Sequence, residues 1–335
     1  MTSRWIFAAA VVAQFAVAED FSVAGRPRVE EPQFVVLDRQ RLRPAGDRIR
    51  ILSYNLQDFT DARRDGKFRT PERAARQARG AASFLDEIDP DIALIEEVEN
   101  ARAILLLNGS LRQPYPLVCI ARFNPGGDQE QKHNIAVLSR LRVLGLREID
   151  FGYLKGPGRP PRGLLSFAVD LGENRRLLVY GMHLKSNWGE AEKNVARRYN
   201  ALSMLTSDVE YIRSRYPAFQ LEMLAAGDMN VDPEGPGFAS DRTLEPLRGW
   251  VDLWRGRPLA ERITLPTRYG DPMQEFPPAT FDRIFVSPEL QQPPWTAAPP
   301  HVLQRGVDTN NVLTAAGEND LHVSDHYPVW VDVAR

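Results

Sequence analysis

An acid and an imidazole stand side by side in Ser324-Asp325-His326-Tyr327-Pro328, directly before the alternating apolar residues Val329, Val331 and Val333. Because such alternation is typical of a strand, a strand would hold the pair rigidly. Other hydrophobic runs also end in reactive polar residues. The complete set is Asn55, Glu97, His183, Asp228, Asn230, Asp282, Asp325 and His326. Each has an ordinary interpretation as a turn former, a solvated acid or a core histidine, but their joint occurrence at strand ends indicates one polar site.

Three of these residues suit a hard divalent cation. Mg²⁺ takes oxygen ligands, often one or two carboxylates, with water and substrate phosphate completing its coordination. Glu97, Asn55 and Asp325 carry such oxygens. We therefore expect these residues to hold Mg²⁺, with Mn²⁺ or Ca²⁺ as alternatives, beside a phosphate ester.

The remaining residues suit the hydrolysis of that ester. His183, Asn230 and His326 can donate hydrogen bonds to phosphoryl oxygens that gain negative charge. A carboxylate such as Asp228 can orient or deprotonate the attacking water. We expect Asp282 to fix the tautomer and orientation of the His326 imidazole.

Basic side chains near these residues are candidates for binding the substrate. Lys185 follows His183 at the two-residue spacing of a strand, so we expect both side chains on one face. Arg162 lies in a loop rich in glycine and proline, where a plain surface charge is the alternative.

Strands and helices in alternation are expected to position the site. Thr70, Pro71 and Glu72 begin a helix that ends before Asp89-Pro90, and residues 190–215 predict a long amphipathic helix. Strands are predicted, ahead of the final one after His326, over residues 48–54, 92–95, 134–139, 164–171, 177–184, 221–226 and 281–286. This order indicates a layered α/β protein. We expect one large catalytic domain over residues 48–335, preceded by an extended arm or edge element at residues 19–47.

The first residues have the pattern of a secretory signal peptide. Arg4 precedes an apolar run from Trp5 to Val17, and Ala16-Val17-Ala18 supplies a cleavage site. The run is too short to span a bilayer, so no transmembrane segment is expected. We expect residues 1–18 to be removed and the chain to be exported to the periplasm or secreted. A buried N-terminal helix is the alternative.

The composition is that of a globular protein, with 335 residues, 43% hydrophobic and 26% charged. The formal net charge of −2 excludes a global basic field for a long polyanion, but it leaves room for a local basic cleft. Cys119 is the only cysteine, which excludes an intramolecular disulfide and a cysteine-based zinc site. We expect a monomer without a stable protein partner.

In order along the chain, several short motifs resemble the endonuclease/exonuclease/phosphatase superfamily. They are Tyr54-Asn55, Ile95–Glu99, His183–Ser186, Gly227–Asn230, Phe281–Ile284 and Ser324–Val329. The resemblance implies the four-layered α/β/β/α sandwich of DNase I, in which two mostly antiparallel sheets pack face to face with helices outside. It also implies a metal-dependent phosphoesterase, with Glu97 as the principal metal ligand and Asn55 near the metal or phosphate. Asp228 and Asn230 would lie at the nucleophile.

Three positions depart from the pattern of that superfamily. The residue before the metal-binding acid is usually Gln but is Glu96 here, which would tighten cation binding or raise the pKa of a neighbour. His133-Asn134 stands where the central strand often begins with glycine, and we include Asn134 among the substrate contacts. Residues 54–57 lack the acid that some family nucleases carry two residues after the Asn.

Together these observations predict an exported, metal-dependent phosphoesterase that cleaves phosphodiester bonds by in-line attack of water, most simply a nuclease with nucleic acid as its partner. A lipid-directed phosphoesterase of the phosphoinositide or sphingomyelin type is the second hypothesis. Trp250, Trp254 and Trp295 could form an exposed loop for a membrane surface, although core packing suits them as well. The third hypothesis is a non-catalytic binding protein on the same scaffold.

Overall fold

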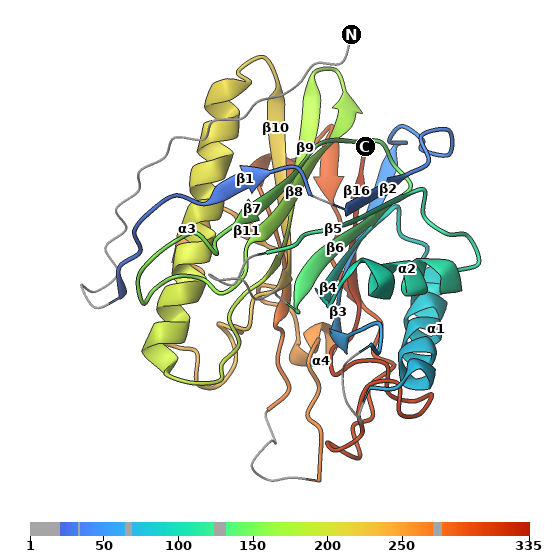
Figure 1. The fold of residues 1–335 in the computed structure, drawn as a ribbon. Coiled ribbons are helices and arrows are strands. Elements are labelled where there is room, and N and C mark those ends of the chain that lie inside the picture. The colour runs from blue at the N-terminus through green and yellow to red at the C-terminus, as the bar shows by residue number, and fades with distance from the viewer. Residues whose placement is uncertain (1–20, 33, 64–68, 124–131, 271–276) are drawn as a thin grey trace.

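Two β-sheets pack face to face in the computed structural model, and helices cover their outer faces (Figure 1). This architecture confirms the predicted four-layered sandwich. The structure describes residues 21–32, 34–63, 69–123, 132–270 and 277–335. The predicted signal peptide lies outside these residues.

One sheet has nine strands, and β3 and β4 are its only parallel pair among the described residues. Helix α1 (Pro71–Ile88) connects β3 to β4, and α2 (Ala101–Ser110) follows β4. The strand order is β13 (Gln291–Gln292), β14 (Trp295–Ala297), β16 (Val329–Ala334), β3 (Arg48–Phe59), β4 (Ile92–Val98), β6 (Asn134–Ser139), β5 (Leu117–Ile120) and β2 (Phe34–Leu37), with β15 (His301–Val302) paired to β16.

The other sheet has seven strands, and β9 and β10 are parallel. Helix α3 (Ala191–Arg215) connects them, as α1 connects β3 to β4. The strand order is β1 (Arg28–Glu30), β7 (Val143–Asp150), β8 (Leu164–Gly172), β9 (Arg175–His183), β10 (Gln220–Asp228), β12 (Asp282–Val286) and β11 (Val251–Asp252). Short helices α4 (Leu259–Arg262), η3 (Glu245–Leu247) and η4 (Pro288–Leu290) lie in the connections.

Apolar side chains fill three layers between these elements. Alternate residues of both sheets, such as Ile51 and Val179, pack in the central layer. Helices α1 and α2 pack on the outer face of the nine-stranded sheet, through residues such as Leu85. Helix α3 packs on the outer face of the seven-stranded sheet through residues such as Leu202 and Leu205. The core therefore holds the two sheets in a fixed relation, which the site requires.

Both long helices lie where the sequence predicted them. The Thr70 side chain accepts a hydrogen bond from the Arg73 backbone N–H, and Asp89 ends α1 in the left-handed conformation. The sequence missed α2, β5 and β7. The run of apolar residues in α2 has no clear period, and Gly145 together with a register shift interrupts the alternation of β7.

The segment expected as an extended arm or edge element contributes an edge strand to each sheet. β1 pairs with β7, and β2 pairs with β5. Trp254 and Trp295 are buried in the central layer, and Trp250 packs against the α3 layer. Among the described residues, no helix combines the length and apolarity needed to cross a membrane.

Candidate active site

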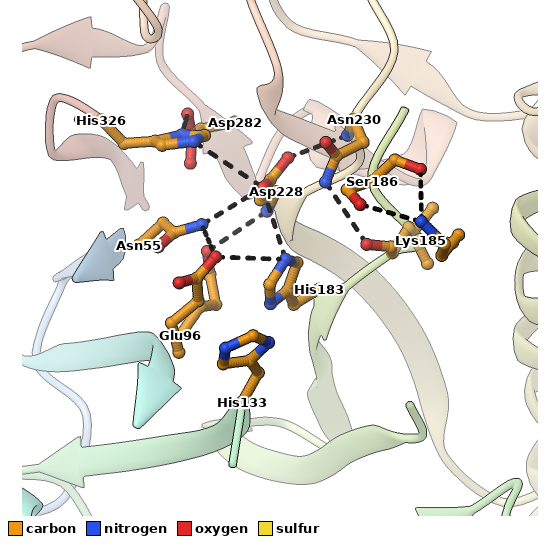
Figure 2. A network of polar contacts seen from close by, with 12 residues as sticks. Asn55, Glu96, His133, His183, Lys185, Ser186, Asp228, Asn230, Asp282 and His326 are labelled. Atoms are coloured by element: carbon orange, nitrogen blue, oxygen red, sulfur yellow. Dashed lines mark hydrogen bonds and ion pairs between the residues drawn. The ribbon is translucent and has the colours of Figure 1, made fainter. Parts of the chain in front are cut away.

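Strand ends from both sheets meet around one cavity of about 1390 Å³. Figure 2 shows part of the polar network around it, with His183, Asp228 and His326 near one another. The predicted site residues that line the cavity are Glu97, His183, Asp228, Asn230, Asp325, His326 and Arg162. Asn55 and Asp282 are fully buried and contact these residues from behind. The structure therefore brings together residues that lie far apart in the sequence.

β3 and β4 lose their regular register as they enter the site. The sequence predicted that β3 ends at Asn55, but the strand continues to Phe59 with a register shift after Asn55. Gln57, Asp58 and Glu97 have φ values of 42°, 55° and 57°. Non-glycine residues adopt this left-handed region only where their surroundings hold them. At Glu97 it breaks the strand alternation, so both Glu96 and Glu97 direct their carboxylates toward the site.

Hydrogen bonds fix the Glu97 carboxylate on the cavity wall. The Asp58 backbone N–H donates to Glu97 Oε2 at 2.7 Å, and Asn55 Nδ2 donates to Glu97 Oε1 at 3.1 Å. Asn55 Nδ2 also donates to Asp228 Oδ2 at 3.2 Å, which joins the two sheets. Asn55 Oδ1 accepts from the Gln57 N–H at 2.9 Å. The Asn55 side chain thus orients the carboxylates of Glu97 and Asp228.

Glu96 occupies a buried position behind the cavity. Its Oε1 accepts from Ser53 Oγ at 2.6 Å, and its Oε2 accepts from the Asp228 backbone N–H at 3.3 Å. Burial and then the negative charge of Asp282 raise the pKa of Glu96 well above its usual value. These contacts place Glu96 behind Asp228 rather than among the residues that line the cavity.

Asp228 ends β10 at the centre of the site. Burial raises its pKa to about 7, against the opposing effect of the His326 charge. Its Oδ1 accepts from the Asn230 N–H at 2.8 Å, while His183 Nε2 and His326 Nε2 lie 3.6 Å and 3.8 Å from its Oδ2. Asp228 can therefore exchange a proton near neutral pH.

The two histidines have opposite electrostatic surroundings. His326 Nδ1 lies 2.7 Å from Asp282 Oδ2. Burial opposes the charged form of His326, but Asp282 and then Asp228 outweigh it and raise the pKa of His326 well above its usual value. Burial and then the charge of Arg162 lower the pKa of His183 well below its usual value. The site thus holds a cationic imidazole and a neutral one.

Two predicted substrate contacts do not reach the cavity. β9 ends at His183, so Lys185 lies in the following loop and does not share a strand face with His183. Its Nζ donates to Ser186 Oγ at 2.9 Å and to the Trp188 carbonyl at 2.9 Å; Figure 2 shows it directed to Ser186. Asn134 Nδ2 donates to the Glu99 carbonyl at 3.0 Å. Lys185 and Asn134 are therefore not among the residues that line the cavity, and their contact with substrate stays a prediction.

Arg162, in contrast, reaches the cavity. Its Nε donates to the His183 carbonyl at 2.9 Å, and its side chain lines the cavity. No carboxylate forms an ion pair with it among the residues that the structure describes. Its charge is therefore available to an anionic ligand.

Two further polar residues of the cavity, Asp58 and His133, were not predicted from the sequence. Asp58 Oδ1 lies 2.6 Å from His133 Nε2, and one ligand atom from each of Asp58, Glu97 and His133 lies within 4.8 Å of the others. The hydrogen bond to His133 lowers the pKa of Asp58 to about 2. Asp58 stands three residues after Asn55. The backbone at Gln57 and Asp58 is left-handed where the Asp58 side chain lies close to Glu97. The only sequence signal for His133 was its position, because His133-Asn134 stands where the central strand of the family often begins with glycine.

The sequence matches the model of the Endonuclease/Exonuclease/phosphatase family over residues 52–326. With the fold and the convergent strand ends, this match shows that the chain belongs to that family. It is therefore a hydrolase of phosphoric ester bonds.

Several solved structures share the fold. Over 87% of this chain and 100% of the other, it is 19% identical, with a TM-score of 0.58, to TDP2 of D. rerio in complex with a single-strand DNA product. A beta toxin from Staphylococcus aureus is 15% identical, with a TM-score of 0.58, over 84% of this chain and 99% of that chain. A family protein from Beutenbergia cavernae is 16% identical, with a TM-score of 0.55, over 86% and 72%. No curated protein sequence matches significantly.

Proposed function

We propose that this phosphoesterase is an exported nuclease that uses a divalent cation to cleave phosphodiester bonds in nucleic acid. The observation that carries the proposal is the convergence of Asp228, His183 and His326 on one cavity beside Glu97. An acid that exchanges protons near neutral pH and two imidazoles of different charge suit in-line attack of water on phosphorus.

The donor set fits the divalent cation that the family implies. Glu97 and Asp325 present carboxylates to the cavity, and Asp58 adds a third. Asn55 supports these ligands from behind through its hydrogen bond to Glu97. A bound divalent cation would polarise the phosphate and offset its charge. Carboxylate oxygens alone would accept Mg²⁺, Ca²⁺ or Mn²⁺.

The residues of the chain then divide the catalytic work. Asp228 orients the attacking water and accepts its proton, with Asn230 fixing the carboxylate through its N–H. His326 donates from Nε2 to a phosphoryl oxygen, because its Nδ1 is committed to Asp282. Neutral His183 stabilises the developing charge with a single hydrogen bond, while Arg162 attracts the phosphate.

Nucleic acid is favoured over lipid as the substrate. The neighbour from D. rerio was solved with a single-strand DNA product, and its whole length aligns with this chain. Trp254 and Trp295 are buried, so they do not form the exposed aromatic loop that a lipid substrate would favour. Trp188, with 68% of its surface exposed, lies at the cavity wall, where a base could stack.

A substrate panel tests this proposal. Residues 19–335 are assayed with single- and double-stranded DNA, RNA and sphingomyelin or phosphoinositide liposomes, with and without EDTA. We expect cleavage of nucleic acid that EDTA abolishes and that Asp228→Asn reduces about 100-fold or more, whereas His301→Gln, on exposed β15, leaves it unchanged. Cleavage of the liposomes alone would favour the lipid hypothesis, and cation binding without any turnover would favour the binding protein.

Export rests on the pattern of residues 1–18. We expect a fusion of these residues to a reporter enzyme to be secreted or periplasmic and to lose them after Ala18. A reporter that stays in the cytoplasm with an intact N-terminus would contradict export.

A further inference from the structure

A nitrogen donor stands among the carboxylates of the proposed cation site. Asp58 Oδ1, His133 Nε2 and a Glu97 carboxylate oxygen lie within 4.8 Å of one another, and all three side chains line the cavity. His133 begins the approach to β6 in the nine-stranded sheet, whereas Asp58 and Glu97 come from β3 and β4. Three adjacent strands of one sheet thus bring one donor atom each to the same part of the cavity.

The backbone builds this arrangement. Asp58 and Glu97 both have left-handed φ values, and the Asp58 N–H donates to Glu97 Oε2. Asp58 Oδ2 pairs with Arg69 at 2.7 Å, which leaves Oδ1 facing His133. Asn134, directly after His133, anchors β6 through its bond to the Glu99 carbonyl. The donors are therefore held by strand geometry rather than by a chance meeting of surface side chains.

The chemistry of the donors discriminates between cations. Mg²⁺ prefers oxygen ligands and near-ideal octahedral geometry, and it binds imidazole poorly. Among first-row transition ions, Fe²⁺, Ni²⁺, Cu²⁺ and Zn²⁺ suit imidazole best; Mn²⁺ also suits carboxylate oxygen but accepts an imidazole nitrogen more readily than Mg²⁺ does. A set that contains His133 beside Asp58 and Glu97 is therefore better matched to such ions than to Mg²⁺.

We propose that Asp58, Glu97 and His133 bind a first-row transition cation in preference to Mg²⁺, with His133 Nε2 as its nitrogen ligand, and that Mn²⁺ reports on this site as a paramagnetic probe. The proposal rests on the proposed metal-dependent function and specifies its cation. The competing explanation is that Asp58 and His133 form only a hydrogen-bonded pair next to an all-oxygen site.

Paramagnetic resonance of Mn²⁺ tests the proposal without relying on activity. Mn²⁺ is titrated into residues 19–335 and then displaced with Mg²⁺, and pulsed spectra are searched for coupling to ¹⁴N. We expect ¹⁴N coupling and an affinity for Mn²⁺ about tenfold or more above that for Mg²⁺. His133→Gln should lose the coupling and weaken Mn²⁺ binding about tenfold, while His301→Gln keeps both.

A second variant shows whether cation binding needs the nitrogen of His133 or only a donor atom at position 133. His133→Asp restores an oxygen donor, so we expect it to bind Mn²⁺ without ¹⁴N coupling and to lose the preference over Mg²⁺. Thermal unfolding of each variant, compared with the parent chain, verifies that the fold is intact.

The results distinguish this inference from the proposed function. Mn²⁺ binding without ¹⁴N coupling, or coupling that persists in folded His133→Gln, would overturn the role of His133 and leave the nuclease in place. Absence of binding by either ion would overturn the cation site altogether. Nitrogen coupling in a chain that hydrolyses no phosphodiester would support the site and refute the nuclease.

Discussion

At the scale of residues, the site holds buried charged groups, and each of them is stabilised by a neighbouring group of opposite charge. His326 stays cationic because Asp282 and Asp228 face it, and Asp228 keeps a pKa of about 7 between burial and the His326 charge. Each group therefore sets the protonation state of the next. Replacing one member should change the behaviour of the others as well as its own.

Asp282→Asn should uncouple His326 from its carboxylate. The pKa of His326 should fall, and kcat should drop about 100-fold or more because the imidazole loses its orientation and charge. Since a raised pKa keeps His326 protonated to higher pH, the alkaline limb of the kcat profile should move to lower pH in the variant. Rate measurements across pH check this, with Asp320→Asn as an exposed control. An unchanged alkaline limb would contradict the pairing.

Glu96 is predicted to act as a positioning residue. Glu96→Gln keeps one oxygen, which can accept from the Asp228 N–H, while its side-chain NH₂ can donate to Ser53 Oγ, so stability should change little. Glu96→Ala leaves two buried donors without an acceptor and should lower the free energy of unfolding by about 2–6 kcal/mol, since each buried unpaired group costs about 1–3 kcal/mol. Denaturant unfolding of both variants checks this. Equal stability of the Gln and Ala variants would show that these bonds contribute nothing.

Sequence patterns identified residues whose side chains follow directly from a strand end. Glu97, His183, Asp228 and His326 all line the cavity as expected. Asp58, His133 and the position of Lys185 could not be derived, because they depend on local departures from regular strands. Such departures depend on the neighbouring strands and leave no periodic signal in one sequence.

At the scale of elements, the parallel strands β9 and β10 position two side chains of the site. β9 and β10 pair in register up to His183 and Asp228, so the two side chains emerge together. Gly227, one residue earlier, has a φ of 147°, and a Cβ there would lie 1.8 Å from the Met182 carbonyl oxygen. Only glycine permits this approach of β10 to β9.

Gly227→Ala should therefore disturb both fold and site. The added Cβ must separate the strands next to Asp228, so the free energy of unfolding should fall by about 3 kcal/mol or more, and activity should fall with it. Gly109→Ala is the matched control: its Cβ meets nothing within 4 Å in α2, so it should stabilise by about 0.5–1 kcal/mol. Denaturant midpoints check both signs. A Gly227→Ala protein as stable as the parent would refute the steric argument.

At the scale of the whole molecule, each sheet contributes the same unit. β3-α1-β4 and β9-α3-β10 are parallel strand pairs joined by a helix on the outer face, and β16 and β12 run antiparallel beside them (Figure 1). The sequence has no visible repeat, because the units share a pattern of burial rather than residue identities. The site lies where the two units meet, so it exists only when both sheets are packed together.

The loop between β15 and β16 should make the stability of the whole molecule depend on pH. His322 in this loop is fully buried, its Nδ1 accepts from the Asp308 N–H at 3.1 Å, and its Nε2 has no hydrogen-bond partner among the described residues. Burial lowers its pKa from 6.5 to about 4. Below pH 6.5, His322 therefore binds a proton in the unfolded chain but stays neutral in the folded chain. The free energy of unfolding falls as the pH decreases.

Between pH 6.5 and pH 5 this histidine should account for a loss of about 2 kcal/mol. His322→Asn retains an acceptor for the Asp308 N–H but has no group that titrates there, so its stability should decrease less over this interval. Denaturant unfolding of both proteins at the two pH values measures the difference. Carboxylates elsewhere contribute equally to both proteins, so parallel losses in the two would show that His322 is free to protonate in the folded chain.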